Sequence, residues 1–139
     1  MRYILNWKRS LRLENKASVR LNGMLGFAMR AGKVIIGTDL VCSALSKKSS
    51  VSLVLLSESA SDQTKKKIRN KCEFYQKPLR HIRIDGEELG RLLGKDFTPM
   101  VVGICDVNFA NEINKALDLQ DVQEKNQTER KEVSHEGNR

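Results

Sequence analysis

The sequence predicts an α/β fold, a three-layer α/β/α sandwich around a small mixed four-stranded sheet. Segments with apolar residues at helical spacing alternate with short apolar runs, in the order α-β-α-β-α-β-α-β-α. A chain of 139 residues, 40% of them apolar, has enough material for one core and not for two. Such alternation is typical of helices that cover both faces of a mixed or parallel sheet.

The first helix is predicted over residues 18–31 by an apolar stripe and by Gly32, a typical helix terminator. A short strand follows at residues 33–36. Gly37 permits a sharp turn, and the Thr38 hydroxyl is placed to cap a second helix that ends near residue 48. The stripe of the first helix consists of Leu21, Met24, Leu25 and Ala28, and that of the second of Leu40, Val41, Ala44 and Leu45.

The remaining elements follow the same alternation. Residues 51–56 form the most apolar run, which is typical of a central strand. Ser61 is placed to cap a third helix whose lysines and arginines crowd its outer surface. Further strands are expected at 79–84 and 101–105, and further helices up to residue 75 and at 87–93 and 109–117.

The charge of the chain favours an anionic partner. The formal net charge is +8 and the pI is near 9.6, and Lys and Arg bind phosphate by releasing its counterions, so nucleic acid is the leading class of partner. Cys42, Cys72 and Cys105 are dispersed, which argues against a zinc site and fits free thiols in a reducing cytoplasm. We therefore expect a cytoplasmic protein without a cofactor, and the absence of a long apolar run predicts no membrane span.

Both ends of the chain differ in composition from its centre. Residues 1–17 are basic and interleaved with aromatic and aliphatic residues, typical of an arm on RNA or a helix that binds a protein partner; a weakly packed extension is an equally open interpretation. Residues 118–139 are polar and are expected to be disordered. The predicted domain is thus residues 18–117.

No catalytic constellation emerges from the sequence. The segment Gly26 to Lys33 fails the spacing of a phosphate-binding loop, and Val34 stands where that loop needs a hydroxyl. In the folded part only His81 is available as a general base. The sequence therefore predicts a non-catalytic protein.

Several short motifs, taken in order, resemble one known family. They are Leu-x-Gly-x-Ala-x-Arg-Ala-Gly-Lys-x-x-x-Gly-Thr from Leu21 onward when gaps are allowed, Val-Leu-Leu-Ser-Glu-Ser-Ala-Ser at 54–61, Thr-Lys-Lys-Lys-Ile at 64–68, Lys-Cys at 71–72, Glu-Leu-Gly at 88–90 and Gly-Lys at 94–95. With the order of elements, they make the chain similar to the L-seven-Ae and L-thirty-e ribosomal proteins, a family of kink-turn RNA binders, over about residues 18–117.

This resemblance implies an RNA interface made of two segments. The N-terminus of the second helix would dock on the tandem sheared G·A pairs of a kinked RNA, and a later loop would lie beside the extruded base. The implied site residues in the first segment are Arg30, Lys33, Gly37, Thr38, Asp39, Leu40 and Ser43, and those in the second are Glu88, Leu89, Gly90, Lys95 and Phe97. Phe97 could cover a splayed nucleotide or anchor its loop in the core.

The chain departs from the family at three positions. Where the RNA binders commonly have Asn, Glu and Lys after the Gly-Thr turn, this chain has Asp39, Leu40 and Ser43. A carboxylate at Asp39 can accept hydrogen bonds from a guanine edge, but it repels phosphates unless lysines compensate. Leu40 would be a core residue, or would pack on a base or on protein.

We therefore expect a non-catalytic protein that binds structured RNA, such as ribosomal RNA, and associates with the ribosome. The first alternative is a protein-interaction module on the same fold, whose binding would depend much less on salt. The second is an enzyme acting on a small molecule or on RNA, for which the sequence supplies no acid–base pair.

Overall fold

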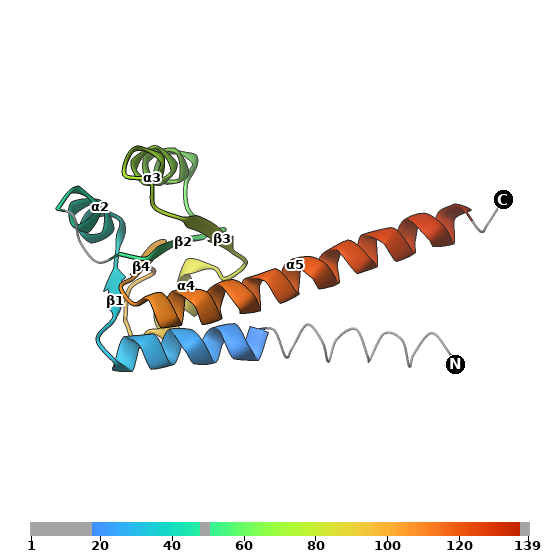
Figure 1. Ribbon diagram of the computed structural model, residues 1–139, viewed down its shortest axis with the longest axis horizontal. Coiled ribbons are helices and arrows are strands. Elements are labelled where there is room, and N and C mark those ends of the chain that lie inside the picture. The colour runs from blue at the N-terminus through green and yellow to red at the C-terminus, as the bar shows by residue number, and fades with distance from the viewer. Residues whose placement is uncertain (1–17, 48–50, 137–139) are drawn as a thin grey trace.

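The computed structural model describes residues 18–47 and 51–136 of the chain (Figure 1). The first described element is a helix over residues 18–30. The other elements are β1 (Val34–Ile36), α2 (Thr38–Ser46), β2 (Leu53–Ser57), α3 (Asp62–Phe74), β3 (Leu79–Ile82), α4 (Gly86–Leu92), β4 (Val101–Ile104) and α5 (Val107–Glu136). This order is the one predicted.

The four strands form one mixed sheet in the order β1-β4-β2-β3. β4 lies between β1 and β2 and is antiparallel to both, whereas β2 and β3 are parallel. In register, Ile36 is opposite Val102 and Val34 is opposite Ile104. As a result, β4 begins at the edge of the sheet where β1, β2 and β3 end.

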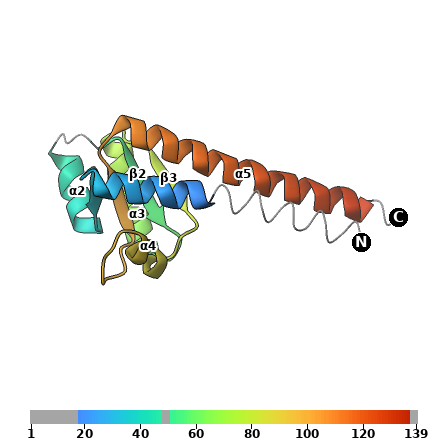
Figure 2. The ribbon, with the colours of Figure 1, turned by 90° about the horizontal axis from the view of Figure 1, so that it is seen from below.

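Helices cover both faces of the sheet, which confirms the predicted sandwich (Figures 1 and 2). One face packs against α2 and α3, through a cluster that includes Val41, Leu45 and Ile68. The other packs against the helix over residues 18–30, α4 and α5, through a cluster that includes Leu25 and Ile113. All five residues of β2 are buried, as expected for a central strand covered on both sides.

α5 differs from the expectation of a disordered tail after Asp118. It continues as a helix to Glu136 and projects away from the sheet (Figures 1 and 2). Residues 118–136 contain neither Pro nor Gly and are rich in Gln, Glu and Lys, which are good helix formers. The Arg80 guanidinium also binds Asp118 at 2.9 Å and Asp121 at 3.2 Å, and so ties this part of α5 to β3.

The helix over residues 18–30 lies beside α5. Arg20 pairs with Glu112 at 2.8 Å, and Gln120 donates a hydrogen bond to the Ser18 hydroxyl at 3.2 Å. The two helices are therefore antiparallel. The sequence-based expectations for residues 1–17 lie outside the described residues.

The helix caps only partly follow the prediction. The Ser61 hydroxyl accepts a hydrogen bond from the Thr64 N–H at 3.2 Å, so Ser61 does cap α3. Thr38 does not cap α2: the N-cap is Gly37, and no side chain bonds to the first turn. The cause is a shift by one residue, which places Thr38 inside the helix.

Ser57 ties together loops at the edge of the sheet where β2 ends. Its buried hydroxyl donates to the Ile84 carbonyl at 2.6 Å and lies 3.0 Å from the Ser59 hydroxyl. The Ser59 hydroxyl in turn accepts from the Gly86 N–H at 2.8 Å and lies 3.3 Å from the Met100 sulfur. These contacts connect the loop after β2 with the start of α4 and with the residues before β4.

We predict that Ser57→Ala destabilises the fold by about 1–3 kcal/mol, because the buried Ile84 carbonyl loses its donor. The free energy of unfolding, measured by urea denaturation, tests this. Ser46→Ala is the matched control: Ser46 is exposed and its hydroxyl bonds back to the Cys42 carbonyl in the preceding helix turn, so its removal should change stability by less than about 0.5 kcal/mol. Equal effects of the two substitutions would contradict the role of Ser57.

We also predict that Gln76→Gly stabilises the fold by about 0.5–1 kcal/mol. Gln76 follows the end of α3 with a φ of 54°, a left-handed conformation that glycine adopts without strain. The turn is otherwise a standard helix stop, in which the Lys77 N–H bonds to the Cys72 carbonyl at 2.8 Å. Lys66→Gly, in the exposed middle of α3, should instead destabilise the fold in the same denaturation assay.

Candidate functional site

The candidate site lies at the edge of the sheet where β1 ends and β4 begins. The Gly37 N–H donates to the Val101 carbonyl at 2.9 Å, so the turn before α2 lies directly beside the first residue of β4. The Ser57 N–H donates to the Met100 carbonyl at 2.8 Å on the other side of β4. The loop between α4 and β4 therefore ends between the start of α2 and the loop that precedes α3.

The first turn of α2 has free backbone donors. The first N–H of α2 with a partner inside the helix is that of Val41, which bonds to the Gly37 carbonyl at 3.0 Å, and no side chain caps the turn. Gly37 has a φ of 109°, and a β-carbon there would face open space. The N–H groups at a helix start, together with the positive end of the helix dipole, favour anions and hydrogen-bond acceptors.

The side chains of this turn point outward. Asp39, Leu40 and Ser43 are all exposed, and the side chain of Asp39 is 97% exposed. Leu40 is 63% exposed, so it is not a core residue, and its place in the apolar stripe of the second helix was wrong. The pattern placed it there because it directly precedes Val41, which is buried.

A lysine of α3 offsets the charge of Asp39. The Lys67 ammonium lies 3.9 Å from an Asp39 carboxylate oxygen, across the contact between α3 and α2. Both groups are more than half exposed, so the pair contributes little to stability. Its consequence is electrostatic, because it lowers the repulsion between Asp39 and an approaching phosphate. Sequence analysis predicted only an exposed surface position for Lys67, because nothing in the order of residues along the chain indicates that it lies beside Asp39.

The second group of site residues lies partly on α4 and partly on the loop between α4 and β4, and its members differ in exposure. Lys95 and Phe97 are exposed, Phe97 by 53%, so Phe97 is not an anchor in the core. Leu89 is fully buried in the core, and a β-carbon at Gly90 would collide with the Phe97 carbonyl oxygen. Leu89 and Gly90 therefore support the loop from below, and they do not reach the surface.

Glu88 is intermediate in exposure between the exposed pair Lys95 and Phe97 and the buried pair Leu89 and Gly90. It is half-buried in the first turn of α4, where its N–H donates to the Asp85 carboxylate at 2.8 Å. Its backbone is thus engaged in the cap of α4.

Arg30 and Lys33 lie away from the start of α2, contrary to expectation. Lys33 precedes β1, and its carbonyl accepts from the Cys105 N–H at 2.8 Å, just after β4 ends. The three residues of β1 separate it from Gly37, and the four extended residue steps from Lys33 to Gly37 span about 13 Å. Arg30 stacks over the Phe27 ring at 4.9 Å. Burial raises the pKa of the Cys105 thiol, and the nearby Lys33 ammonium acts in the opposite direction.

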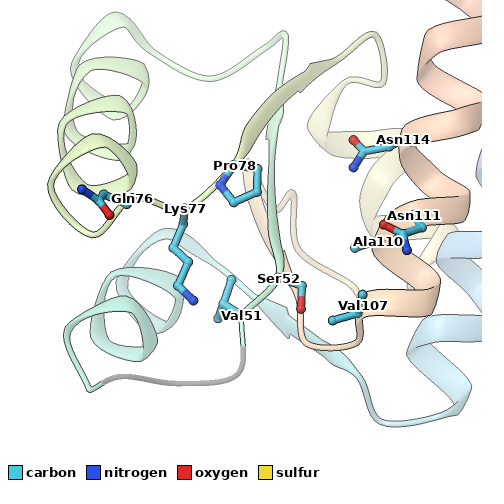
Figure 3. A pocket seen from close by; sticks show the side chains of 9 residues that line it. All are labelled: Val51, Ser52, Gln76, Lys77, Pro78, Val107, Ala110, Asn111 and Asn114. Atoms are coloured by element: carbon cyan, nitrogen blue, oxygen red, sulfur yellow. The ribbon is translucent and has the colours of Figure 1, made fainter.

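A concavity lies at the edge of the sheet opposite to the start of α2 (Figure 3). It is an open depression of about 540 Å³ between the starts of β2 and β3 and the first turns of α5. Asn111 and Asn114 line one wall and Lys77 lines another. None of the site residues predicted from the sequence lines it.

Among the described residues, no three His, Cys, Asp or Glu side chains come together in a way that could hold a metal ion. His81 is exposed on β3, in register with Leu56. No helix within residues 18–47 and 51–136 is long and apolar enough to cross a membrane.

Comparison with known proteins gives relatives that span most of the chain. The RNA-binding protein YlxQ of Bacillus subtilis is 40% identical over 95 residues, which cover 68% of this chain and 92% of that protein. The large ribosomal subunit protein eL30 of Sulfolobus acidocaldarius is 35% identical over 89 residues, which cover 64% and 85%. Their names, an RNA-binding protein and a ribosomal protein, agree with the non-catalytic protein that the sequence predicts.

Two solved structures share the fold. A protein of unknown function from Bacillus halodurans has a TM-score of 0.66 at 33% identity, over 71% of this chain and 97% of that one. The Giardia lamblia 15.5kD RNA binding protein has a TM-score of 0.60 at 15% identity, over 78% and 90%, and this similarity shows the fold alone.

The family model of the ribosomal protein L7Ae/L30e/S12e/Gadd45 family matches residues 20–114, which contain the sheet, α2, α3, α4 and the first turns of α5. The resemblance seen in the sequence is thereby confirmed, and the chain belongs to this family.

Proposed function

We propose that this protein binds structured RNA at the edge of the sheet where α2 begins. The observation that carries the proposal is the uncapped start of α2, where Gly37 leaves backbone donors open to a ligand beside the exposed loop before β4. Relatives named as an RNA-binding protein and as a ribosomal protein support RNA as the ligand. A net charge of +8 supports a polyanion in general.

The finer proposal concerns the RNA shape. Sheared G·A pairs of a kinked RNA present base edges and phosphates close together, and an uncapped helix start can meet both with N–H groups. Asp39 accepts hydrogen bonds from guanine amino and imino groups, with Lys67 offsetting its charge. Lys95 and Phe97 supply a cation and an aromatic ring from the neighbouring loop. We propose ribosomal RNA as a source of such an element, and the cytoplasm as the place of action.

The alternative is an interface for a protein partner. Leu40 and Phe97 are both apolar and exposed at this edge, and apolar side chains suit a protein surface as well as a base. A protein interface would bind with weak dependence on salt, whereas phosphate contacts lose affinity steeply as salt rises.

The central test compares two RNAs. We expect tight binding to a kink-turn RNA and much weaker binding to a control in which the G·A pairs are replaced by Watson–Crick pairs, as measured by fluorescence anisotropy. If about six phosphates are neutralised, affinity should fall about a thousandfold between about 50 and 200 mM salt. Equal, salt-dependent binding of both RNAs would reduce the function to general RNA binding. Binding to neither would favour the protein interface.

A second prediction concerns Asp39. Asp39→Ala should raise affinity for both RNAs several-fold, because a negative charge near phosphate is removed, and should lower the preference for the kink-turn RNA by about tenfold, because an acceptor for guanine is lost. Asp121→Ala makes the same change of charge on α5, far from the site, and should alter neither quantity by more than about twofold. An unchanged preference in Asp39→Ala would remove Asp39 from the site.

Lys33 tests where the interface ends. The resemblance implies Lys33 as a site residue, but Lys33 lies before β1, at the edge of the sheet opposite to the start of α2. Lys67→Glu should therefore weaken binding of the kink-turn RNA by at least about tenfold, and Lys33→Glu by less than about threefold, in the same anisotropy assay. The reverse order would place the interface at the start of β1.

A further inference from the structure

Four residues of α3 form a continuous ridge on its outer surface. Lys67, Asn70, Lys71 and Phe74 are spaced three and four positions apart, and residues at these spacings are neighbours on one face of a helix. Lys67, Asn70 and Phe74 are exposed, and Lys71 is half-buried. Lys71 borders the face of α3 on which Ile68 and Cys72 are buried in the core. We call these four residues the α3 ridge. It is about 10 Å long, at 1.5 Å of rise per residue.

Phe74 is the unusual member of the ridge. Its exposed fraction is 77%, the highest among the large apolar residues that the structure describes. Its ring makes an edge contact with Tyr75, with 4.9 Å between centroids and an interplanar angle of 84°. Tyr75 packs against the core beneath α3. The Phe74 ring is thus held by an anchored neighbour while most of its surface stays open to solvent, and the packing of the fold does not require it there.

The ridge is basic, and it runs from the candidate site along α3 toward the opposite edge of the sheet. Lys67 and Lys71 are its charged members, and it contains no acid. Within the described residues, the ion pair found for this ridge is that of Lys67 with Asp39, at 3.9 Å. That pair joins one end of the ridge to the first turn of α2, and Phe74 lies at the other end.

We propose that the α3 ridge binds an unpaired stretch of RNA that flanks the structured element held at the start of α2. Base stacking on an exposed aromatic ring, with lysines on the phosphates, is the usual way in which proteins hold single strands. In this arrangement a base stacks on Phe74, Lys67 and Lys71 contact the phosphates, and the Asn70 amide reaches a base edge. This inference rests on the proposed function, because the structured element positions the flanking strand.

The experiment places a fluorescent reporter at the ridge. The only tryptophan of the chain is Trp7, so the double substitution Trp7→Phe and Phe74→Trp leaves one indole, at position 74. The protein is titrated with a blunt kink-turn RNA, with the same RNA carrying an unpaired adenosine tail at one end or the other, and with the tail alone. Anisotropy of labelled RNA measures affinity, and indole fluorescence reports stacking.

We expect one of the tailed RNAs to bind about tenfold more tightly than the blunt RNA and to quench the indole, since stacking of one base gives a gain of this order. In the natural chain, Phe74→Ala should abolish the gain from the tail and leave affinity for the blunt RNA unchanged. Leu119→Ala, which truncates an exposed apolar residue on α5, is the matched control and should retain the gain.

The other outcomes separate the two proposals. Equal affinity for blunt and tailed RNA without quenching would overturn the role of the ridge and leave the proposed function intact. Binding of neither RNA would overturn both. A concentration-dependent blue shift of the indole without RNA would assign Phe74 to a contact between copies of the chain, and would also overturn the inference.

Discussion

The position of β4 is the constraint on which the candidate interface depends. Because β4 lies between β1 and β2 and is antiparallel to both, it begins where they end. The hydrogen bond from the Gly37 N–H to the Val101 carbonyl joins the end of β1 to the start of β4. It brings the loop from α4 beside the start of α2, although about sixty positions separate them in the sequence. A β4 parallel to β1 would end at this edge and would place the loop at the other one.

Electrostatics at this edge come from backbone and side chains together. The uncapped start of α2 offers N–H groups and the positive end of a dipole, while Asp39 adds a negative charge at the same place. Lys67 of α3 offsets the negative charge of Asp39. The Asp39 carboxylate and the Lys67 ammonium lie together because α2 and α3 pack side by side on one face of the sheet.

Local patterns in the sequence predicted the fold better than the site. The apolar stripe with Leu25 and Ala28 and the apolar run of β2 predict buried residues directly. The alternation of helix and strand predicts the layers of the sandwich. The tail was mispredicted because low apolar content was taken as disorder, whereas its helix formers and the bonds to Arg80 favour a helix. The cap at Thr38 failed by one residue, a shift that no local pattern resolves.

The positions of the site residues in space do not follow from local patterns in the sequence. Leu89 and Gly90 belong to a matching motif, but their burial follows from how the loop before β4 folds back on α4. Lys33 is close to Gly37 in sequence and lies at the far end of a strand. Lys67 is far from Asp39 in sequence and lies beside it. These relations depend on sheet order and helix packing, which a single sequence states only indirectly.

The most direct test of the interface is to map it by amide chemical shifts in NMR as a kink-turn RNA is added. We expect the largest shifts at Gly37, Thr38, Asp39 and Leu40 and in the loop over residues 94–100, with small shifts around Asn111 and Asn114 at the opposite edge. Large shifts confined to that opposite edge or to α5, with the amides of the first turn of α2 unmoved, would contradict the account.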